Sequence, residues 1–252
     1  MNDKPEMFGK LTKSQFKSIK SLKQKKFRDE NRAFIIEGKK MVHEAMQSSV
    51  EIQMMLVRND ADISIEGQFD SYELSSKEMV ALSNMKTAPE VMAVCNFMKE
   101  PILNFDQSIL ALDEISDPGN LGTIIRICDW FGIEQIVCNP GSVELYNPKV
   151  VQSTMGSIFR VNVFRGDIED FLNKKPAAMK VFSADMNGEN VYQSKLTEPF
   201  FLIMGSESHG LRKELIDKSD EIISIPGFGS AESLNVAVAT SVILSEFKRR
   251  QF

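Results

Sequence analysis

The chain has 252 residues, of which 42% are hydrophobic and 26% charged, with a formal net charge of −5. This composition is typical of a globular protein of one large or two small domains with a core of normal size. It holds three cysteines, an odd number with no CxxC spacing, which argues against a disulfide framework and a zinc site. We find no apolar leader and no window of 18 continuous apolar residues, so we expect no membrane span and a cytoplasmic protein without a metal.

The charge is distributed unevenly along the chain. Residues 1–40 contain 12 Lys/Arg and 5 Asp/Glu, a net charge of +7, whereas the remaining 212 residues hold 18 basic and 30 acidic side chains, a net charge of −12. A basic segment in front of an acidic body is one pattern that indicates a nucleic-acid partner. A solvated helix rich in lysine is the alternative, and charge alone does not decide between the two.

The first part of the chain predicts a small α/β domain over residues 1–104. Residues 11–49 are typical of a helix, a strand and a second helix, because apolar residues alternate with lysines before the short apolar run "AFIIEG". Two further strands are predicted at 50–57 and 91–97. The sequence "SSKE" (75–78) predicts a capping box at the start of a short helix.

The second domain is predicted over residues 105–252, after Pro101 and its polar neighbours interrupt the periodicity. Strands are predicted at 108–115, 133–138, 158–163, 179–184, 200–204 and 221–225. Helices are predicted near 119–131, 147–156, 167–174, 209–218 and 233–249. This alternation predicts an α/β fold with a mostly parallel sheet and helices on both faces, whose ligands bind at the carboxyl ends of the strands.

Three loops follow predicted strands of this sheet and are rich in glycine and small polar residues. They are "DPGNLG" (117–122), "GSESHGL" (205–211) and "IPGFGSAESLN" (225–235). Such loops let the backbone approach a ligand closely and point its N–H groups toward it. Their composition therefore indicates a binding site at this edge of the sheet.

Each loop also has a purely structural interpretation. "DPGN" is a turn in which Asn120 could cap a helix, and Asn147 before Pro148 predicts a second helix cap. His209 is more consistent with a cap or surface role than with catalysis. "GFGSAE" has Glu232 where a dinucleotide-binding fingerprint needs Gly or Ala, and no phosphate-binding GxxxxGK[ST] occurs, so a nucleotide-dependent oxidoreductase is disfavoured.

Taken together, the blocks resemble one family, the SpoU/TrmH RNA ribose 2′-O-methyltransferases of the SPOUT class. The resemblance is carried by "DPGNLGTIIRICDWFG", "IMGSESHGL", "IPGFGSAESLNVAVATSVILSEF" and a lesser block, "YNPKVVQSTMGSIFRV". The segment "SLKQKKFRDENRAFIIEG" is similar to the small substrate-binding domain that many members carry in front. Two positions depart from the family pattern: Gln152 stands where many members have Arg, and Ser206 where many have Asn.

The resemblance implies a C-terminal trefoil knot, a homodimer packed partly through the last helix, and a pocket for S-adenosylmethionine formed by Gly205, Ile225 and Leu234. It implies methyl transfer to a ribose 2′-hydroxyl of a structured RNA, with ribosomal RNA favoured over transfer RNA and with the basic residues 1–40 contacting the RNA. A catalytically silent RNA-binding paralogue is the alternative.

The resemblance also assigns the polar residues of the site. Arg126 would act on the substrate, either as the base that deprotonates the 2′-hydroxyl or as a clamp on phosphate and developing alkoxide charge. A surface ion pair of Arg126 with Asp129 or Asp117 is the structural alternative. The remaining polar positions, which would order the pocket and the hydroxyl, are Asn120, Glu207, Ser233 and Asn235.

Overall fold

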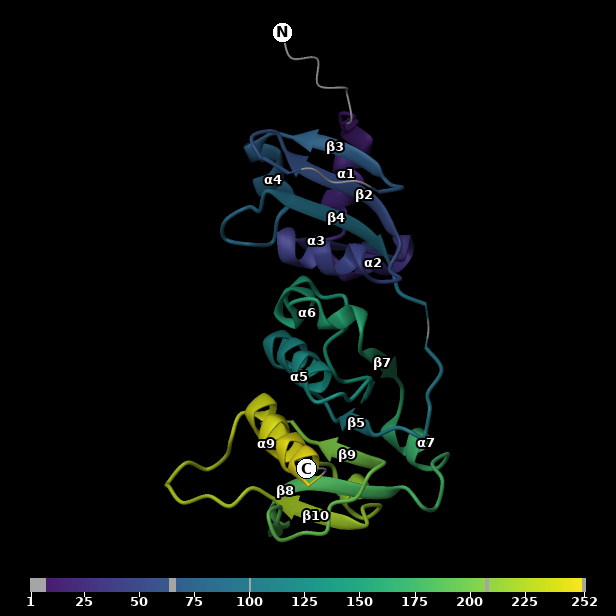
Figure 1. Ribbon diagram of the computed structural model, residues 1–252, viewed down its shortest axis with the longest axis vertical. Coiled ribbons are helices and arrows are strands. Elements are labelled where there is room, and N and C mark those ends of the chain that lie inside the picture. The colour runs from purple at the N-terminus through teal and green to yellow at the C-terminus, as the bar shows by residue number, and fades with distance from the viewer. Residues whose placement is uncertain (1–7, 64–66, 100, 207–208, 251–252) are drawn as a thin grey trace. The chain divides into compact units, whose positions relative to one another are not determined.

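The computed structural model describes residues 8–63, 67–99, 101–206 and 209–250. The chain divides into two compact units, one within Met1–Lys99 and Tyr146–Phe159, the other within Glu100–Leu145 and Arg160–Phe252 (Figure 1). Within the described ranges, no helix is long and apolar enough to cross a membrane.

The first unit is built on a four-stranded sheet in the order β1-β4-β2-β3. β1 and β2 pair antiparallel with β4, whereas β3 pairs parallel with β2. The strands are β1 (Ala33–Glu37), β2 (Ile52–Arg58), β3 (Asp70–Leu74) and β4 (Val91–Asn96). The helices are α1 (Lys13–Ser21), α2 (Lys25–Asn31), α3 (Lys39–Met46), α4 (Ser76–Leu82) and α6 (Pro148–Thr154).

The N-terminal helix expected before β1 is interrupted between α1 and α2. Arg28 is only 3% exposed, and its Nη1 donates to the carbonyl oxygens of Leu22 at 2.8 Å and Lys23 at 2.9 Å. These carbonyl groups lie where α1 ends. In a longer helix they would accept hydrogen bonds from main-chain N–H groups one turn further on, and here they accept from the buried guanidinium instead. Strand β3 was not predicted, because only Leu74 is buried along it and the apolar alternation is weak.

The second unit is built on a six-stranded sheet in which every neighbouring pair is parallel, in the order β10-β8-β9-β5-β6-β7. Its strands are β5 (Ile109–Leu112), β6 (Gln135–Cys138), β7 (Asn162–Arg165), β8 (Lys180–Asn190), β9 (Phe200–Met204) and β10 (Glu221–Ser224). Its helices are α5 (Pro118–Trp130), α7 (Ile168–Leu172), α8 (Lys213–Ile216) and α9 (Val236–Arg249).

Both faces of this sheet are covered. Phe201 and Ile203 of β9 belong to a buried cluster with Leu172 of α7 and Leu215 of α8. On the other face, the Phe200 ring lies 4.0 Å from that of Phe247 in α9, and α9 packs beside α5 (Figure 1). Successive residues of one strand thus point to opposite faces of the sheet. Because helices bury both faces, the strands are apolar throughout. The predicted parallel α/β fold is confirmed.

Two predicted elements of this region were placed incorrectly. The strand expected at 158–163 begins as a 3-10 turn at Ser157–Phe159, and β7 starts at Asn162, four residues later than the pattern indicated. The helix expected at 209–218 contains only the four residues of α8. Its first half is loop because Gly210 has a φ of +65° and pairs with Ser206 instead of entering a helix.

Candidate active site at the carboxyl edge of the sheet

The first glycine-rich loop leads from β5 into α5. The Asp117 side chain caps this helix by accepting from the main-chain N–H of Asn120 at 2.9 Å, and Pro118 occupies the first helical position. The alternative in which Asn120 caps the helix is therefore wrong. Because Asp117 performs the capping, the side chain of Asn120 is not the one that caps the start of α5.

A contact to the Asn120 side chain comes from the third loop. Asn235 caps α9, its Oδ1 accepting from the main-chain N–H groups of Ala237 at 3.0 Å and Val238 at 3.3 Å. Its Nδ2 donates to Oδ1 of Asn120 at 3.0 Å. The structure thus joins two of the predicted site residues directly, and with them the first and third loops.

Arg126 lies on the exposed surface of α5. It makes no hydrogen bond or ion pair with any residue that the structure describes. Of its two candidate structural partners, Asp129 pairs with Arg160 at 2.8 Å, and Asp117 caps the helix. The alternative of a surface ion pair for Arg126 is therefore wrong among the described residues, none of which neutralises its guanidinium.

The two ends of the second loop, after β9, are joined by backbone hydrogen bonds. Ser206 and Gly210 exchange main-chain hydrogen bonds of 3.2 and 3.0 Å. A Cβ on Gly205 would lie 2.4 Å from the carbonyl carbon of Gly210 and 2.7 Å from the Leu211 nitrogen, so only glycine fits there. Packing within the loop therefore explains Gly205 at least as directly as approach to a ligand does. Glu207 lies outside the described residues.

The third loop leaves β10 at Ile225, which is half-buried, and returns to α9 through Ser233 and Leu234. Figure 1 shows this segment, in yellow, running outward from the sheet before α9 begins. Ser233 is exposed, and Leu234 is 48% exposed. Gly205 and Ile225 follow β9 and β10, which both neighbour β8, so they share one edge about 10 Å apart.

The structure therefore places the described members of the predicted set in or next to loops at one edge of the sheet, but joins only some of them directly. Asn120 and Asn235 touch, and Arg126 lies six residues, about 9 Å, further along α5 from Asn120. Leu234, Ile225 and the main-chain groups around them combine apolar surface with N–H and C=O groups, which is what a nucleoside-containing cofactor such as S-adenosylmethionine requires. The residues present fit that cofactor.

Family models match both parts of the chain. The SpoU rRNA methylase family matches residues 107–245, which is more than half of the chain. The chain belongs to the SpoU rRNA methylase family. A second model, the MRM3-like substrate binding domain, matches residues 13–93.

Relatives in this family resemble the chain over nearly its full length. The 23S rRNA (guanosine(2553)-2′-O)-methyltransferase RlmP of Bacillus subtilis is 34% identical over 90% of this chain and 93% of its own. A TrmH-family protein from Porphyromonas gingivalis is 32% identical with a TM-score of 0.87, covering 96% of this chain and 100% of its own. An AdoMet-bound rRNA methyltransferase from Sinorhizobium meliloti is 28% identical with a TM-score of 0.86, covering 98% and 99%.

Three residues that the sequence did not single out also lie at this edge of the family domain. Asp113 directly follows β5, Asn139 follows β6, and Arg212 follows the second loop. Asp113 accepts hydrogen bonds from both of the other side chains. The only sequence signal was a carboxylate at the end of a buried apolar strand, where an unpaired charge is costly.

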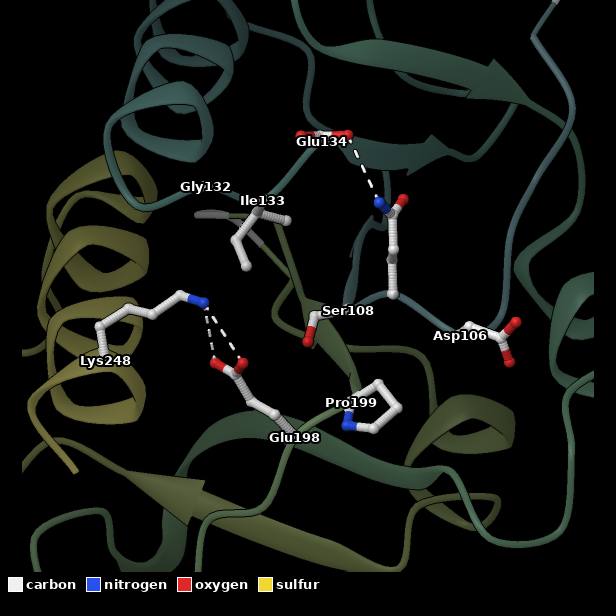
Figure 2. A pocket seen from close by; sticks show the side chains of 9 residues that line it. Asp106, Ser108, Gly132, Ile133, Glu134, Glu198, Pro199 and Lys248 are labelled. Atoms are coloured by element: carbon white, nitrogen blue, oxygen red, sulfur yellow. Dashed lines mark hydrogen bonds and ion pairs between the residues drawn. The ribbon is translucent and has the colours of Figure 1, made fainter. Parts of the chain in front are cut away.

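A separate pocket of about 360 Å³ lies at the opposite, amino edge of the sheet (Figure 2). Lys248 points to Glu198 there and pairs with it at 3.0 Å. None of the predicted site residues lines the pocket. It therefore has no part in the site inferred from the three loops.

The cysteines lie in the core behind this edge of the sheet and do not supply nucleophiles to it. Cys95, Cys128 and Cys138 are all fully buried, and none is in a disulfide. Burial raises the pKa of the Cys95 and Cys138 thiols to about 12. At neutral pH these thiols are protonated and inert as nucleophiles, so they act as small core residues.

Proposed function

We propose that this protein transfers a methyl group from S-adenosylmethionine to a ribose 2′-hydroxyl of ribosomal RNA. The observation that carries the proposal is the hydrogen bond between Asn120 and Asn235, which brings the first and third loops together on the helix that bears the exposed Arg126. The RlmP relative, matched over most of both chains, supports the reaction type and favours ribosomal over transfer RNA.

The cofactor-binding residues of the proposal are Gly205, Ile225 and Leu234. When bound, S-adenosylmethionine supplies an electrophilic methyl group on a sulfonium. Ile225 and Leu234 would offer apolar surface to the adenosine, and the tight turn at Gly205 would present main-chain groups beside it. AdoMet is also present in the Sinorhizobium meliloti relative.

The catalytic residues of the proposal are Arg126, Asn120, Glu207, Ser233 and Asn235. The attacking hydroxyl must lose a proton and develops negative charge as it does so. We assign Arg126 as an electrostatic clamp on the RNA phosphate and on this developing charge, because guanidinium groups ordinarily have pKa values above about 12 and rarely act as bases. The four polar residues would orient the hydroxyl and order the loops.

RNA binding is assigned to the basic segment 1–40. Lys13, Lys17 and Lys20 are exposed, share one face of α1, and make no ion pair with any described residue. By contrast, Lys25 and Lys26 of α2 pair with Asp29 and Glu30. We therefore place the phosphate contacts on α1, where the positive charge is not already neutralised.

The architecture that accompanies this function is part of the proposal. We propose a trefoil knot in the C-terminal region and a functional boundary between residues 1–104 and 105–252. We also propose a homodimer that packs through α5 and α9, because Trp130 is 84% and Val238 51% exposed on these neighbouring helices. The cytoplasm is the expected location, where ribosomal RNA is available.

The test has two arms. Calorimetry should detect S-adenosylmethionine binding, and incubation of the protein with radiolabelled cofactor and unmodified ribosomal or transfer RNA should label one of them. Mapping of 2′-O-methyl groups should then find one labelled nucleotide in ribosomal RNA. Labelling of transfer RNA alone would show that the substrate is transfer RNA. RNA binding without any methyl transfer would identify a catalytically silent paralogue.

A further inference from the structure

Asp113 is buried, at 1% exposure, directly after β5. Its carboxylate accepts from Nε of Arg212 at 3.0 and 3.1 Å and from Nδ2 of Asn139 at 2.8 Å. Asn139 is itself buried and is held to the end of β5 by its main-chain N–H, which donates to Leu112 at 3.1 Å. Asn139, which follows β6, thus helps to fix the orientation of the carboxylate that Arg212 binds.

The same residue holds both ends of the second loop. The main-chain N–H of Asp113 donates to the carbonyl oxygen of Met204 at 2.9 Å, and Met204 is the last residue before the loop. Arg212, which the carboxylate binds, is the first residue after it. Between these anchors, Ser206 and Gly210 close the turn against Gly205.

The geometry of the Asp113–Arg212 ion pair indicates that the pair positions the chain more than it stabilises the fold. Nε of Arg212 contacts both carboxylate oxygens, whereas the strongest Arg–carboxylate pairs use two parallel N–H groups. Nη2 of Arg212 is buried and has no hydrogen-bond partner among the described residues. Burying a charged pair costs desolvation energy that the attraction between the charges often does not recover, so the position in which the pair holds the chain accounts for it better than stability does.

We propose that Asp113 and Arg212 are positioning residues that hold Gly205 in place by anchoring Met204 before it and the chain at Arg212 after the turn, with Asn139 orienting the carboxylate. The proposal rests on the proposed function, because Gly205 belongs to the S-adenosylmethionine site. When the anchor is lost, Gly205 spends only a fraction of its time in the binding-competent position, and apparent affinity falls by that fraction.

The experiment compares Arg212→Met and Arg212→Lys with the full-length wild type. The Arg212 side chain is 34% exposed, so we expect both variants to fold. Arg212→Met leaves the buried Asp113 carboxylate without a cation and should lower Tm, which is why a destabilised control is needed. We expect calorimetry to give a Kd for S-adenosylmethionine raised about tenfold or more in Arg212→Met, with a smaller rise in Arg212→Lys. The KM for S-adenosylmethionine should rise in parallel, while kcat at saturating cofactor and the KM for RNA change little.

The control is Glu246→Gln, which breaks another buried ion pair of the same unit. Glu246 is 4% exposed and binds Arg249 and Arg250 near the C-terminal end of α9, about 16 Å along the helix from Asn235. The neighbouring guanidinium groups lower the pKa of its carboxyl to about 2, so the pair is intact at neutral pH. The control should lower Tm without changing the Kd for S-adenosylmethionine.

The outcomes separate this inference from the proposed function. A wild type that fails to bind S-adenosylmethionine overturns the proposed function itself. A wild type that binds, together with an Arg212→Met variant of unchanged Kd, overturns the positioning role alone. An equal rise in Kd for Glu246→Gln at a matched loss of Tm also overturns it, because the effect would then reflect general destabilisation.

Discussion

Asn235 donates a hydrogen bond of 3.0 Å to Asn120 across 115 residues of sequence. Its orientation is fixed, because its Oδ1 is occupied by the two main-chain N–H groups that it caps at the start of α9, leaving its Nδ2 as the donor. Asn120 must therefore present its oxygen. One amide side chain thus begins a helix and connects two loops of the site.

Replacing Asn235 by serine should separate these two roles. A serine can cap α9 but is too short to reach Asn120, so Tm should stay close to that of the wild type while methyl transfer falls about 10–100-fold through loss of loop alignment. Thermal melts and single-turnover methylation measure the two effects. Asp167→Ser, a cap replacement on α7 of the same unit, is the control. Full activity of Asn235→Ser would mean that the link is dispensable.

Arg126→Ala should leave the fold and S-adenosylmethionine affinity unchanged, because the side chain is exposed and binds no described residue. Methyl transfer should fall about 10²–10³-fold, the usual cost of removing one stabiliser of developing negative charge. Arg126→Lys should recover only part of the rate, since an ammonium lacks the planar fork. Thr123→Ala, an exposed change on the same helix, is the control and should keep the wild-type rate. Equal rates in both Arg126 variants and the wild type would show that Arg126 has no part in the mechanism.

Gly205 and Gly227 provide a matched pair of glycines in two loops of the site. A methyl group on Gly205 would meet the Gly210 backbone at 2.4 Å, whereas one on Gly227 would meet nothing within 4 Å. Gly205→Ala should therefore force the turn apart, cost roughly 1–3 kcal/mol of unfolding free energy and weaken S-adenosylmethionine binding. Gly227→Ala should be tolerated. Chemical denaturation and calorimetry test both, and similar behaviour of the two variants would contradict the packing argument.

Replacing Lys13, Lys17 and Lys20 together by glutamine should weaken RNA binding about tenfold at moderate salt and reduce the slope of log K against log salt by about 2. The double replacement of Lys25 and Lys26 should have a smaller effect, because aspartate and glutamate already neutralise these lysines. Filter binding over a salt series measures both. Equal losses in the two variants would indicate general charge attraction instead of a contact surface on α1.

The local signals in the sequence predicted local structure well. The "SSKE" capping box forms as expected, with Ser75 and Glu78 bonded to each other's main chain, and Asn147 caps α6 ahead of Pro148. These features depend on hydrogen bonds between residues at most three positions apart, so a short window contains both partners. The parallel sheet was predictable for a similar reason, because strands buried on both faces are apolar throughout.

Features that failed or were missed depend on partners distant in sequence. From its neighbours in sequence, Asn120 is a plausible helix cap. Its hydrogen bond with Asn235 becomes visible only in the folded structure. Asp113 and Arg212 are 99 residues apart, and no spacing rule connects them. Sequence by itself determined the family, the alternation of elements and the loops that carry the chemistry. Tertiary structure decided which side chains of those loops meet, because parallel strands bring their carboxyl ends to one edge in an order that the chain does not follow.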